Sequence, residues 1–239
     1  MGRKKITCVY LNLGLTDYQT AWKLQKLLAE NRLQQHIPDL VLFMEHPHTI
    51  TMGKSGREEN LLIDPAQMTG KGIVYEKVDR GGDVTYHGPG QLVAYPILNL
   101  SQIREDVIWY LRQLEEVIIR TLAQFRISAA RKEKYTGVWV GEEKIAAIGV
   151  KVSRWITTHG LALNIRPDMS YYNYIIPCGI RNKNVTSMVK LGKKDVTPAQ
   201  VIPKMVKQFA DVFQFRMMPY NHASRPVLAE LLASHKMNY

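Results

Sequence analysis

Hydrophobic positions along this chain follow two repeating patterns, which predict strands interspersed with helices. Residues 6–13 alternate between apolar and polar side chains, as in a strand with one buried face. Residues 40–46 (LVLFMEH) are almost continuously apolar, as expected for a strand buried on both faces. Shorter runs of the same kinds predict five more strands, at 73–78, 91–98, 136–141, 144–152 and 157–165.

Helical spacing of apolar residues predicts four helices between and after these strands. Thr16 or Asp17 is placed to cap the first helix, because either side chain can accept a hydrogen bond from the first turn. Thr197 followed by Pro198 is a typical start for the third helix. The predicted helices cover about 17–34, 103–126, 197–213 and 225–235.

Strands and helices are mixed without strict alternation, and the chain contains no repeat and no clear linker. The pattern therefore predicts one mixed-sheet domain of the α/β (α+β) class over residues 1–239. Its core is expected at about 6–195, with a small C-terminal helical segment at about 197–239. Two polar or glycine-rich stretches, 54–72 and 80–90, are expected to form loops and a turn.

Composition excludes several classes of protein. With 239 residues, of which 46% are hydrophobic and 22% charged, the chain is neither disordered, nor collagenous, nor a coiled coil. No apolar run approaches the roughly 20 residues of a membrane span, and the start is interpreted as a strand and not as a signal peptide. Two cysteines, Cys8 and Cys178, are too few for a disulfide framework, so we expect reduced thiols in a cytoplasmic protein.

The net charge of +11 is concentrated in the second half of the chain. Residues 1–130 carry a net +1, whereas residues 131–239 carry +10. This excess suggests an anionic partner, either nucleic acid or an acidic protein. The chain shows no known nucleic-acid motif and no dense basic cluster with interleaved aromatic residues. A merely basic and soluble surface explains the charge equally well.

The segment Arg80–Gln91 (RGGDVTYHGPGQ) crowds reactive side chains into a glycine-rich turn. Its four glycines allow the backbone to approach a ligand closely. Arg80 offers paired donors to a carboxylate or phosphate, and His87 is an acid–base candidate. The segment is neither a phosphate-binding loop of the GxxxxGK[ST] type nor a dinucleotide fingerprint. The alternative is a tight hairpin in which the glycines serve only the turn.

Lys144 begins a predicted strand that is otherwise small and apolar (GEEKIAAIGV, 141–150). A lysine at this place either extends outward from the end of the strand into water or is partly shielded from water. In the second case it is suited to act as a base or as the positive neighbour of a thiolate. Strict alternation places Lys144 with Ala146, Ile148 and Val150 on one face of the strand, and Ile145, Ala147 and Gly149 on the other.

Cys178 lies between Pro177 and Gly179 in YIIPCGI, which favours a turn that presents the thiol. A buried, inert cysteine is the alternative for Cys178 and the expectation for Cys8.

His159, in the small-residue segment TTHGLALN (157–164), is a second imidazole candidate. His46 and His48 are two residues apart, but Pro47 disturbs the strand between them and no third ligand is near. We therefore predict no metal site.

Four of these segments together resemble the lipoate-biosynthesis octanoyltransferases of the LipB type. The resemblance covers about residues 10–190 and includes HPHTITMG at 46–53. Its specificity comes from four strings in the right order: RGGDVTYHGPGQLVAYPI at 80–97, TGVWVGEEKIAAIGVKV at 136–152, THGLALNI at 158–165 and IIPCGI at 175–180.

The resemblance implies a fold like that of biotin and lipoate protein ligases. It also implies transfer of an octanoyl (or lipoyl) group from acyl carrier protein to a lysine of a lipoyl domain, through a cysteine thioester. The acceptors would be lipoyl domains of 2-oxoacid dehydrogenase E2 subunits and the glycine cleavage H protein. No cofactor, metal, nucleic acid or membrane is implied.

The same resemblance assigns roles to individual residues. Cys178 would be the nucleophile and Lys144 its partner. His159 is a supporting candidate from the residue pattern and not from the resemblance. The acyl group would lie against Arg80, Gly81, Gly82, Asp83, Val84, Thr85, Tyr86, His87, Ala147, Ile148, Gly149, Gly160, Leu161 and Ala162.

Two other functions remain open at this point. An ATP-dependent lipoate or biotin ligase would share the fold, and would require no thiol and form an acyl-adenylate. A basic nucleic-acid-binding protein would show salt-sensitive binding to DNA or RNA and no reaction with acyl carrier protein.

Overall fold

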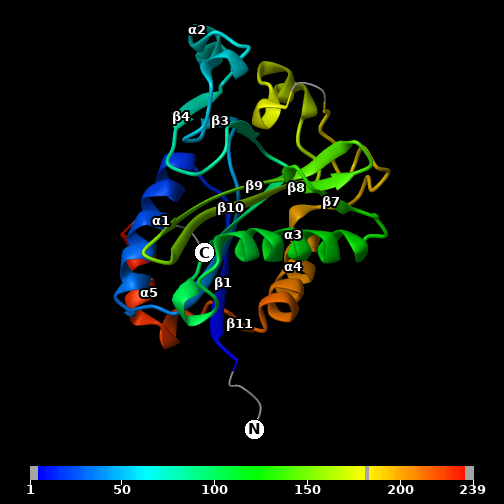
Figure 1. The fold of residues 1–239 in the computed structure, drawn as a ribbon. Coiled ribbons are helices and arrows are strands. Elements are labelled where there is room, and N and C mark those ends of the chain that lie inside the picture. Colours follow the sequence, from blue (N-terminus) through cyan, green and yellow to red (C-terminus); the bar gives the residue numbers. More distant parts are fainter. Residues whose placement is uncertain (1–4, 181–182, 235–239) are drawn as a thin grey trace.

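An eight-stranded mixed sheet forms the centre of the molecule, for which a computed structural model describes residues 5–180 and 183–234 (Figure 1). β1 pairs in parallel with both of its neighbours, and the remaining pairs are antiparallel. In spatial order the strands are β11 (Arg216–Pro219), β1 (Thr7–Leu15), β2 (Asp39–Glu45), β6 (Gln91–Ile97), β10 (Ile156–Asn164), β9 (Glu143–Ser153), β8 (Tyr135–Val140) and β7 (Ala130–Lys132).

Helices cover both faces of this sheet (Figure 1). On one face, apolar side chains of α3 (Val107–Ala123) and α4 (Pro198–Phe213) pack on inner residues of the sheet such as Phe43. On the other face, α1 (Tyr18–Leu33) and α5 (Pro226–Ala233) contribute a second apolar cluster. Burying apolar side chains on both faces explains why residues 40–44 of the inner strand β2 are all apolar.

A second, three-stranded sheet lies at one end of the large one, beside α2 (Figure 1). Its β5 strand alternates, with Val84 and Tyr86 in a third apolar cluster. This sheet and the short helical elements are β4 (Val74–Lys77), β3 (Thr49–Met52), β5 (Val84–His87), α2 (Pro65–Gly70), and the 3₁₀ turns at Glu58–Asn60, Leu100–Gln102, Met169–Tyr174, Pro177–Gly179 and His222–Ser224.

A β-bulge in β9 changes which side chains share a face. Val138 of β8 is opposite Ala146, whereas its neighbour Trp139 is opposite Lys144, so Ile145 is an extra residue. Ile145 and Ala146 therefore both lie in the core beneath α3, and Lys144 lies on the face of Ala147 and Gly149. The prediction that Lys144 shares a face with Ala146, Ile148 and Val150 is wrong, because the bulge resets the alternation.

Most predicted elements are confirmed within a few residues. The structure adds the short strands β3 and β7, which were not predicted, and it places α2 in the stretch 54–72 that was expected to be a loop. Other elements differ in place or extent. β5 occupies part of the predicted 80–90 turn, and the second helix begins at Val107, capped by Asp106, and not at about 103. The segment after residue 197 is helical as predicted, but it also contains β11, and its helices complete both cores of the sheet. The final predicted helix position, 235, lies outside the described residues.

Among residues 5–180 and 183–234, no helix combines the length and the apolar composition that crossing a bilayer requires.

Candidate active site

A cavity of about 580 Å³ lies over β9 and β10, beside the small sheet. This volume is typical of pockets for small organic ligands. Its floor consists of small residues, since Ala147 is paired with Ala162 and Gly149 with Gly160 across the two strands. Because these residues carry little or no side chain, the space between the floor and the loops above it is not filled by side chains from the two strands.

Cys178 lies at one end of this cavity, in a tight turn formed by Pro177–Gly179. Its φ of +56° lies in the left-handed region, where a residue with a side chain is uncommon and where strain often accompanies function. Three backbone hydrogen bonds hold the turn. The Gly179 N–H donates to the Ile176 carbonyl at 3.0 Å and the Ile180 N–H to the Pro177 carbonyl at 3.1 Å, and the Ile176 N–H donates to the Asn60 carbonyl at 2.8 Å. The thiol is therefore presented at a fixed place and remains partly accessible.

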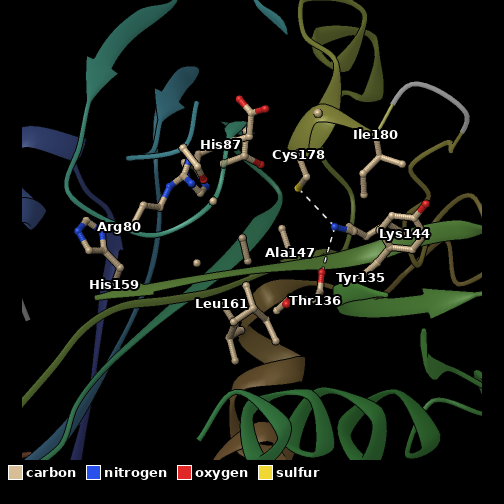
Figure 2. Close-up of a pocket in the computed structure, with 18 of the residues that line it drawn as sticks. Arg80, His87, Tyr135, Thr136, Lys144, Ala147, His159, Leu161, Cys178 and Ile180 are labelled. Carbon is tan, nitrogen blue, oxygen red and sulfur yellow. Dashed lines mark hydrogen bonds between the residues drawn. The ribbon is translucent and has the colours of Figure 1, made fainter. Parts of the chain in front are cut away.

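Lys144 reaches the same end of the cavity from β9. Its Nζ donates to Cys178 Sγ at 3.3 Å and to the Thr136 carbonyl at 3.1 Å, and it lies 5.0 Å from the centre of the Trp139 ring (Figure 2). Only 6% of Lys144 is exposed. Within the described residues, no carboxylate lies within 4.0 Å of this ammonium, and the Cys178 sulfur is the side-chain group to which it donates a hydrogen bond.

Arg80 adds a second buried positive charge to the cavity wall. One terminal nitrogen donates to both the Thr51 carbonyl and hydroxyl at 2.8 Å, and the other donates to the Gly81 carbonyl at 3.1 Å. Burial lowers the pKa of Arg80, although a guanidinium stays charged near neutral pH. The guanidinium is fixed by neutral acceptors, which leaves its charge available to the cavity.

His159 lies at the opposite end of the cavity from Lys144 (Figure 2). Its Nε2–H donates to Asp79 at 2.8 Å, and its φ is +57°. This hydrogen bond is the main reason that the pKa of Asp79 is held low, with Lys151 adding to the effect. Burial lowers the pKa of His159 even though Asp79 opposes this, so the imidazole is neutral at neutral pH.

His87 and two tyrosines also line the cavity. His87 donates to Gln91 Oε1 at 2.7 Å, and burial lowers its pKa to about 3. Tyr18 and Tyr95 are almost fully buried, and burial raises the pKa of Tyr18 to about 12. At neutral pH all three side chains are uncharged, which suits a wall that contacts an apolar ligand.

The structure brings most of the predicted site residues to the cavity. Cys178, Lys144 and His159 line it, and so do Arg80, Gly82, Asp83, Thr85, His87, Ala147, Ile148, Gly149, Gly160, Leu161 and Ala162. Three others lie outside the lining. Val84 and Tyr86 point into the core of the small sheet, and Gly81 donates its N–H to the Val150 carbonyl at 2.9 Å, which fastens the loop to β9.

The sequence interpretation missed several lining residues, among them Tyr18, Asn60, Tyr95, Thr136 and Ile180. Tyr18 and Tyr95 occupy buried positions of a helix and a strand, and they look like ordinary core residues in the sequence. Their hydroxyl groups were the available signal, since a buried tyrosine usually has a polar neighbour.

No group of three or more His, Cys, Asp or Glu side chains suited to a metal ion occurs in the described part of the chain. His46 hydrogen-bonds instead to the Thr16 carbonyl and the Tyr95 hydroxyl.

Comparisons with known proteins give a consistent result. Residues 17–210 match the family described as "Lipoyl protein ligase A/B catalytic domain". The chain is 50% identical over 212 residues to an octanoyltransferase of Solibacter usitatus, covering 89% of this chain and 96% of that protein. It is 46% identical to an octanoyltransferase of Flavobacterium psychrophilum, covering 84% and 94%.

Solved structures show the same fold at much lower identity. A lipoate-protein ligase A bound with ATP matches with a TM-score of 0.72 at 16% identity, covering 98% of this chain and 97% of the other. A biotin protein ligase from Aquifex aeolicus matches with a TM-score of 0.50 at 14% identity, covering 87% and 69%.

Proposed function

Because the chain belongs to the lipoyl protein ligase A/B catalytic domain family, we propose that it transfers an octanoyl (or lipoyl) group from acyl carrier protein to a lipoyl-domain lysine through a thioester on Cys178. The enzyme is an acyltransferase, as its octanoyltransferase relatives are. The observation that carries the cysteine mechanism is the 3.3 Å contact between Lys144 Nζ and Cys178 Sγ at one end of the cavity.

The first step exchanges one thioester for another. The Cys178 thiolate attacks the carbonyl carbon of octanoyl-acyl carrier protein, and the tetrahedral intermediate expels the carrier's thiolate, which then takes up a proton. The Lys144 ammonium favours the attacking thiolate because it is buried beside Sγ with no competing carboxylate within ion-pair distance in the described residues. One thioester is lost and one is formed, so the step needs no ATP.

The second step forms the more stable amide. The amine of the acceptor lysine attacks the Cys178 thioester, the C–S bond breaks, and the Cys178 sulfur leaves as a thiolate. Lys144 is near enough to this sulfur to stabilise the leaving thiolate, and when neutral it can take the proton lost by the attacking amine. The enzyme is then ready for another donor.

The acyl chain would extend from Cys178 over the floor formed by Ala147, Gly149, Gly160 and Ala162. An eight-carbon chain is apolar, and each buried methylene stabilises the complex by about 0.8 kcal/mol. Neutral His87, Tyr18 and Tyr95 would line part of its path, so that these three side chains bury the chain without placing a charge against it.

The charge distribution fits the proposed protein partners. The net +10 of residues 131–239 complements acyl carrier protein, which is strongly acidic in general, and many lipoyl domains are acidic as well. The acceptors we propose are lipoyl domains of 2-oxoacid dehydrogenase E2 subunits and the glycine cleavage H protein.

An ATP-dependent ligase is the main alternative on this fold, since the structural match includes a ligase bound with ATP. The contact between Cys178 and Lys144 favours the transferase, because a ligase that makes an acyl-adenylate has no need of an activated thiol.

Intact-mass spectrometry after mixing with octanoyl-acyl carrier protein tests the proposal. We expect a gain of one octanoyl group, mapped to the Cys178 peptide, without ATP, and lost in Cys178→Ser. Cys8→Ala is the matched control, because the Cys8 thiol is fully buried and away from the cavity. Octanoyl transfer by Cys178→Ser at the normal rate, or a strict requirement for ATP, would contradict the mechanism.

A further inference from the structure

Glu115 of α3 is a fully buried carboxylate that lies outside the cavity lining. Its two oxygens have different partners. Oε2 accepts hydrogen bonds from Arg112 at 2.8 Å and Arg131 at 3.1 Å, whereas Oε1 accepts one from the backbone N–H of Gly137 at 3.0 Å. The two arginines balance the negative charge of Glu115. They do not explain why its other oxygen, Oε1, accepts a hydrogen bond from the backbone of β8.

The Gly137 N–H belongs to the same peptide group as the Thr136 carbonyl, and that carbonyl accepts from Lys144 Nζ at 3.1 Å. A single rigid peptide unit therefore has Glu115 at one end and the Lys144 ammonium at the other. The contacts run from Glu115 through this peptide to Lys144 and on to Cys178, at 3.0, 3.1 and 3.3 Å. Because peptide groups are planar, fixing the N–H fixes the direction of the carbonyl.

The backbone at Gly137 does little by itself to fix the orientation of this peptide group. Gly137 has a φ of +121°, outside the range that residues with side chains adopt. A Cβ at this position would lie 2.6 Å from the Ala146 carbonyl oxygen and 3.3 Å from Lys144 Cε. Glycine is thus required beside Lys144, and its conformational freedom leaves the orientation of the peptide to its hydrogen bonds.

We propose that Glu115 is a positioning residue for the reaction: it holds the Thr136 carbonyl toward Lys144, which keeps the ammonium against Cys178. The inference rests on the proposed function of Lys144 and Cys178. A negative charge at the N–H end of the peptide also polarises its carbonyl, which makes that oxygen a better acceptor for an ammonium in a buried place.

Glu115→Ala and Glu115→Asp, with Arg112→Gln as the matched control, test this role. Alanine removes the acceptor, and aspartate keeps the buried charge but shortens the reach to Gly137. Arg112 contacts only the other oxygen and is partly exposed, so its loss affects the ion pair and leaves the Gly137 hydrogen bond in place. The measurement is the rate of iodoacetamide alkylation of Cys178 between pH 6 and 9, followed on its own peptide, together with octanoyl transfer.

We expect Glu115→Ala to slow alkylation at pH 7 by up to about tenfold, the effect of losing one positioning hydrogen bond, and to move the rate profile to higher pH. Glu115→Asp should show the same change to a smaller extent, and it decides the question if the alanine variant does not fold. Arg112→Gln should match the wild type at every pH. In a Lys144→Ala background, Glu115→Ala and Glu115→Asp should have no further effect.

Three results would overturn the inference: wild-type alkylation in the folded Glu115 variants, an equal loss in Arg112→Gln, or an undiminished effect in the Lys144→Ala background. Failure of the proposed function looks different, because Lys144→Ala alone would then alkylate like the wild type.

Discussion

Gly149 lies directly opposite Gly160 in the β9–β10 ladder, yet the two glycines are needed for different reasons. A Cβ at Gly160 would overlap the backbone carbonyl of Ala94 in β6, within the sheet itself. A Cβ at Gly149 would instead approach the Arg80 side chain at 3.0 Å and the Gly81 carbonyl at 3.1 Å, above the cavity floor. Gly160 thus serves the packing of the sheet, whereas Gly149 leaves space above the cavity floor for the Arg80 side chain and the Gly81 carbonyl.

The same substitution should therefore have different effects at the two positions. Gly160→Ala should lower the free energy of unfolding by at least about 2 kcal/mol, because a rigid backbone must move. Gly149→Ala should cost less than about 1 kcal/mol but slow octanoyl transfer, because Arg80 must shift. Urea unfolding and transfer rates measure the two effects. A loss as small in Gly160→Ala as that expected for Gly149→Ala would show that β6 adjusts to the methyl group at little cost.

Replacing Lys144 should change the reactivity of Cys178 more than the fold. Lys144→Met keeps the apolar stem but removes the charge beside Sγ, so alkylation of Cys178 at pH 7 should fall at least tenfold and recover at alkaline pH. Lys132→Met is the control, because Lys132 also lies near the Trp139 ring, at 5.2 Å, but is paired with Glu142. An unchanged alkylation rate in Lys144→Met would show that the Lys144 ammonium does not activate Cys178.

The turn that holds Cys178 should be sensitive to a methyl group at Gly179. Gly179 has a φ of +69°, and a Cβ there would lie 2.6 Å from an oxygen of Asp83. Gly179→Ala should lose about 1–2 kcal/mol to backbone strain and should also acylate slowly, because the clash displaces the neighbouring thiol. Intact-mass spectrometry after short reaction times measures the rate of acylation.

Gly192→Ala is the control that introduces backbone strain without a steric clash. Gly192 has a φ of +85°, but a Cβ there meets nothing within 4 Å. This variant should lose similar stability and acylate at the wild-type rate. If both variants acylate equally, the contact between Gly179 and Asp83 has no part in presenting the thiol.

Buried histidines should make the protein less stable in mild acid. Burial lowers the pKa of His46 to about 4 and that of His87 to about 3, whereas both are near 6.5 in the unfolded chain. Between pH 6.5 and 4 the unfolded state binds more protons, so stability falls as the pH falls, by up to about 1.4 kcal/mol per pH unit for each histidine. The loss should continue for His87 down to pH 3.

Urea unfolding at intervals from pH 7 to pH 4 measures this slope. His46→Gln should flatten it, whereas substitution of the exposed His36 by glutamine should leave it unchanged. An equal slope in the wild type and His46→Gln would show that His46 is not the source of the acid sensitivity.

The sequence predicted the site better than the geometry that produces it. The resemblance carried by four short strings indicated Cys178, Lys144 and most of the predicted lining residues, whereas the residue patterns alone left inert alternatives open for both side chains. No residue type identifies the bulge at Ile145, because an apolar residue fits a regular strand and a bulged strand equally well. Alternation alone therefore placed Lys144 on the wrong face.

Glu115 illustrates a second limit of sequence reasoning. It is followed by Glu116, and two adjacent glutamates on an amphipathic helix resemble an exposed face. Its burial depends on Arg131 and on the Gly137 N–H, which come from strands that follow in the chain and reach Glu115 only after folding. Tertiary partners of this kind leave no trace in the local pattern. The short edge strands β7 and β11 were missed for the same reason, because their local sequence does not show which strand each of them pairs with.

The pairing of β1 with β11 joins the first strand of the sheet to the last. During translation, one edge of β1 therefore has no neighbour until residues 216–219 have left the ribosome. Until then the nascent chain exposes a row of unsatisfied amides that favours misassembly with other chains. Shortened versions that end at α4 would keep every residue of the cavity, but they would carry this open edge permanently and should aggregate on expression.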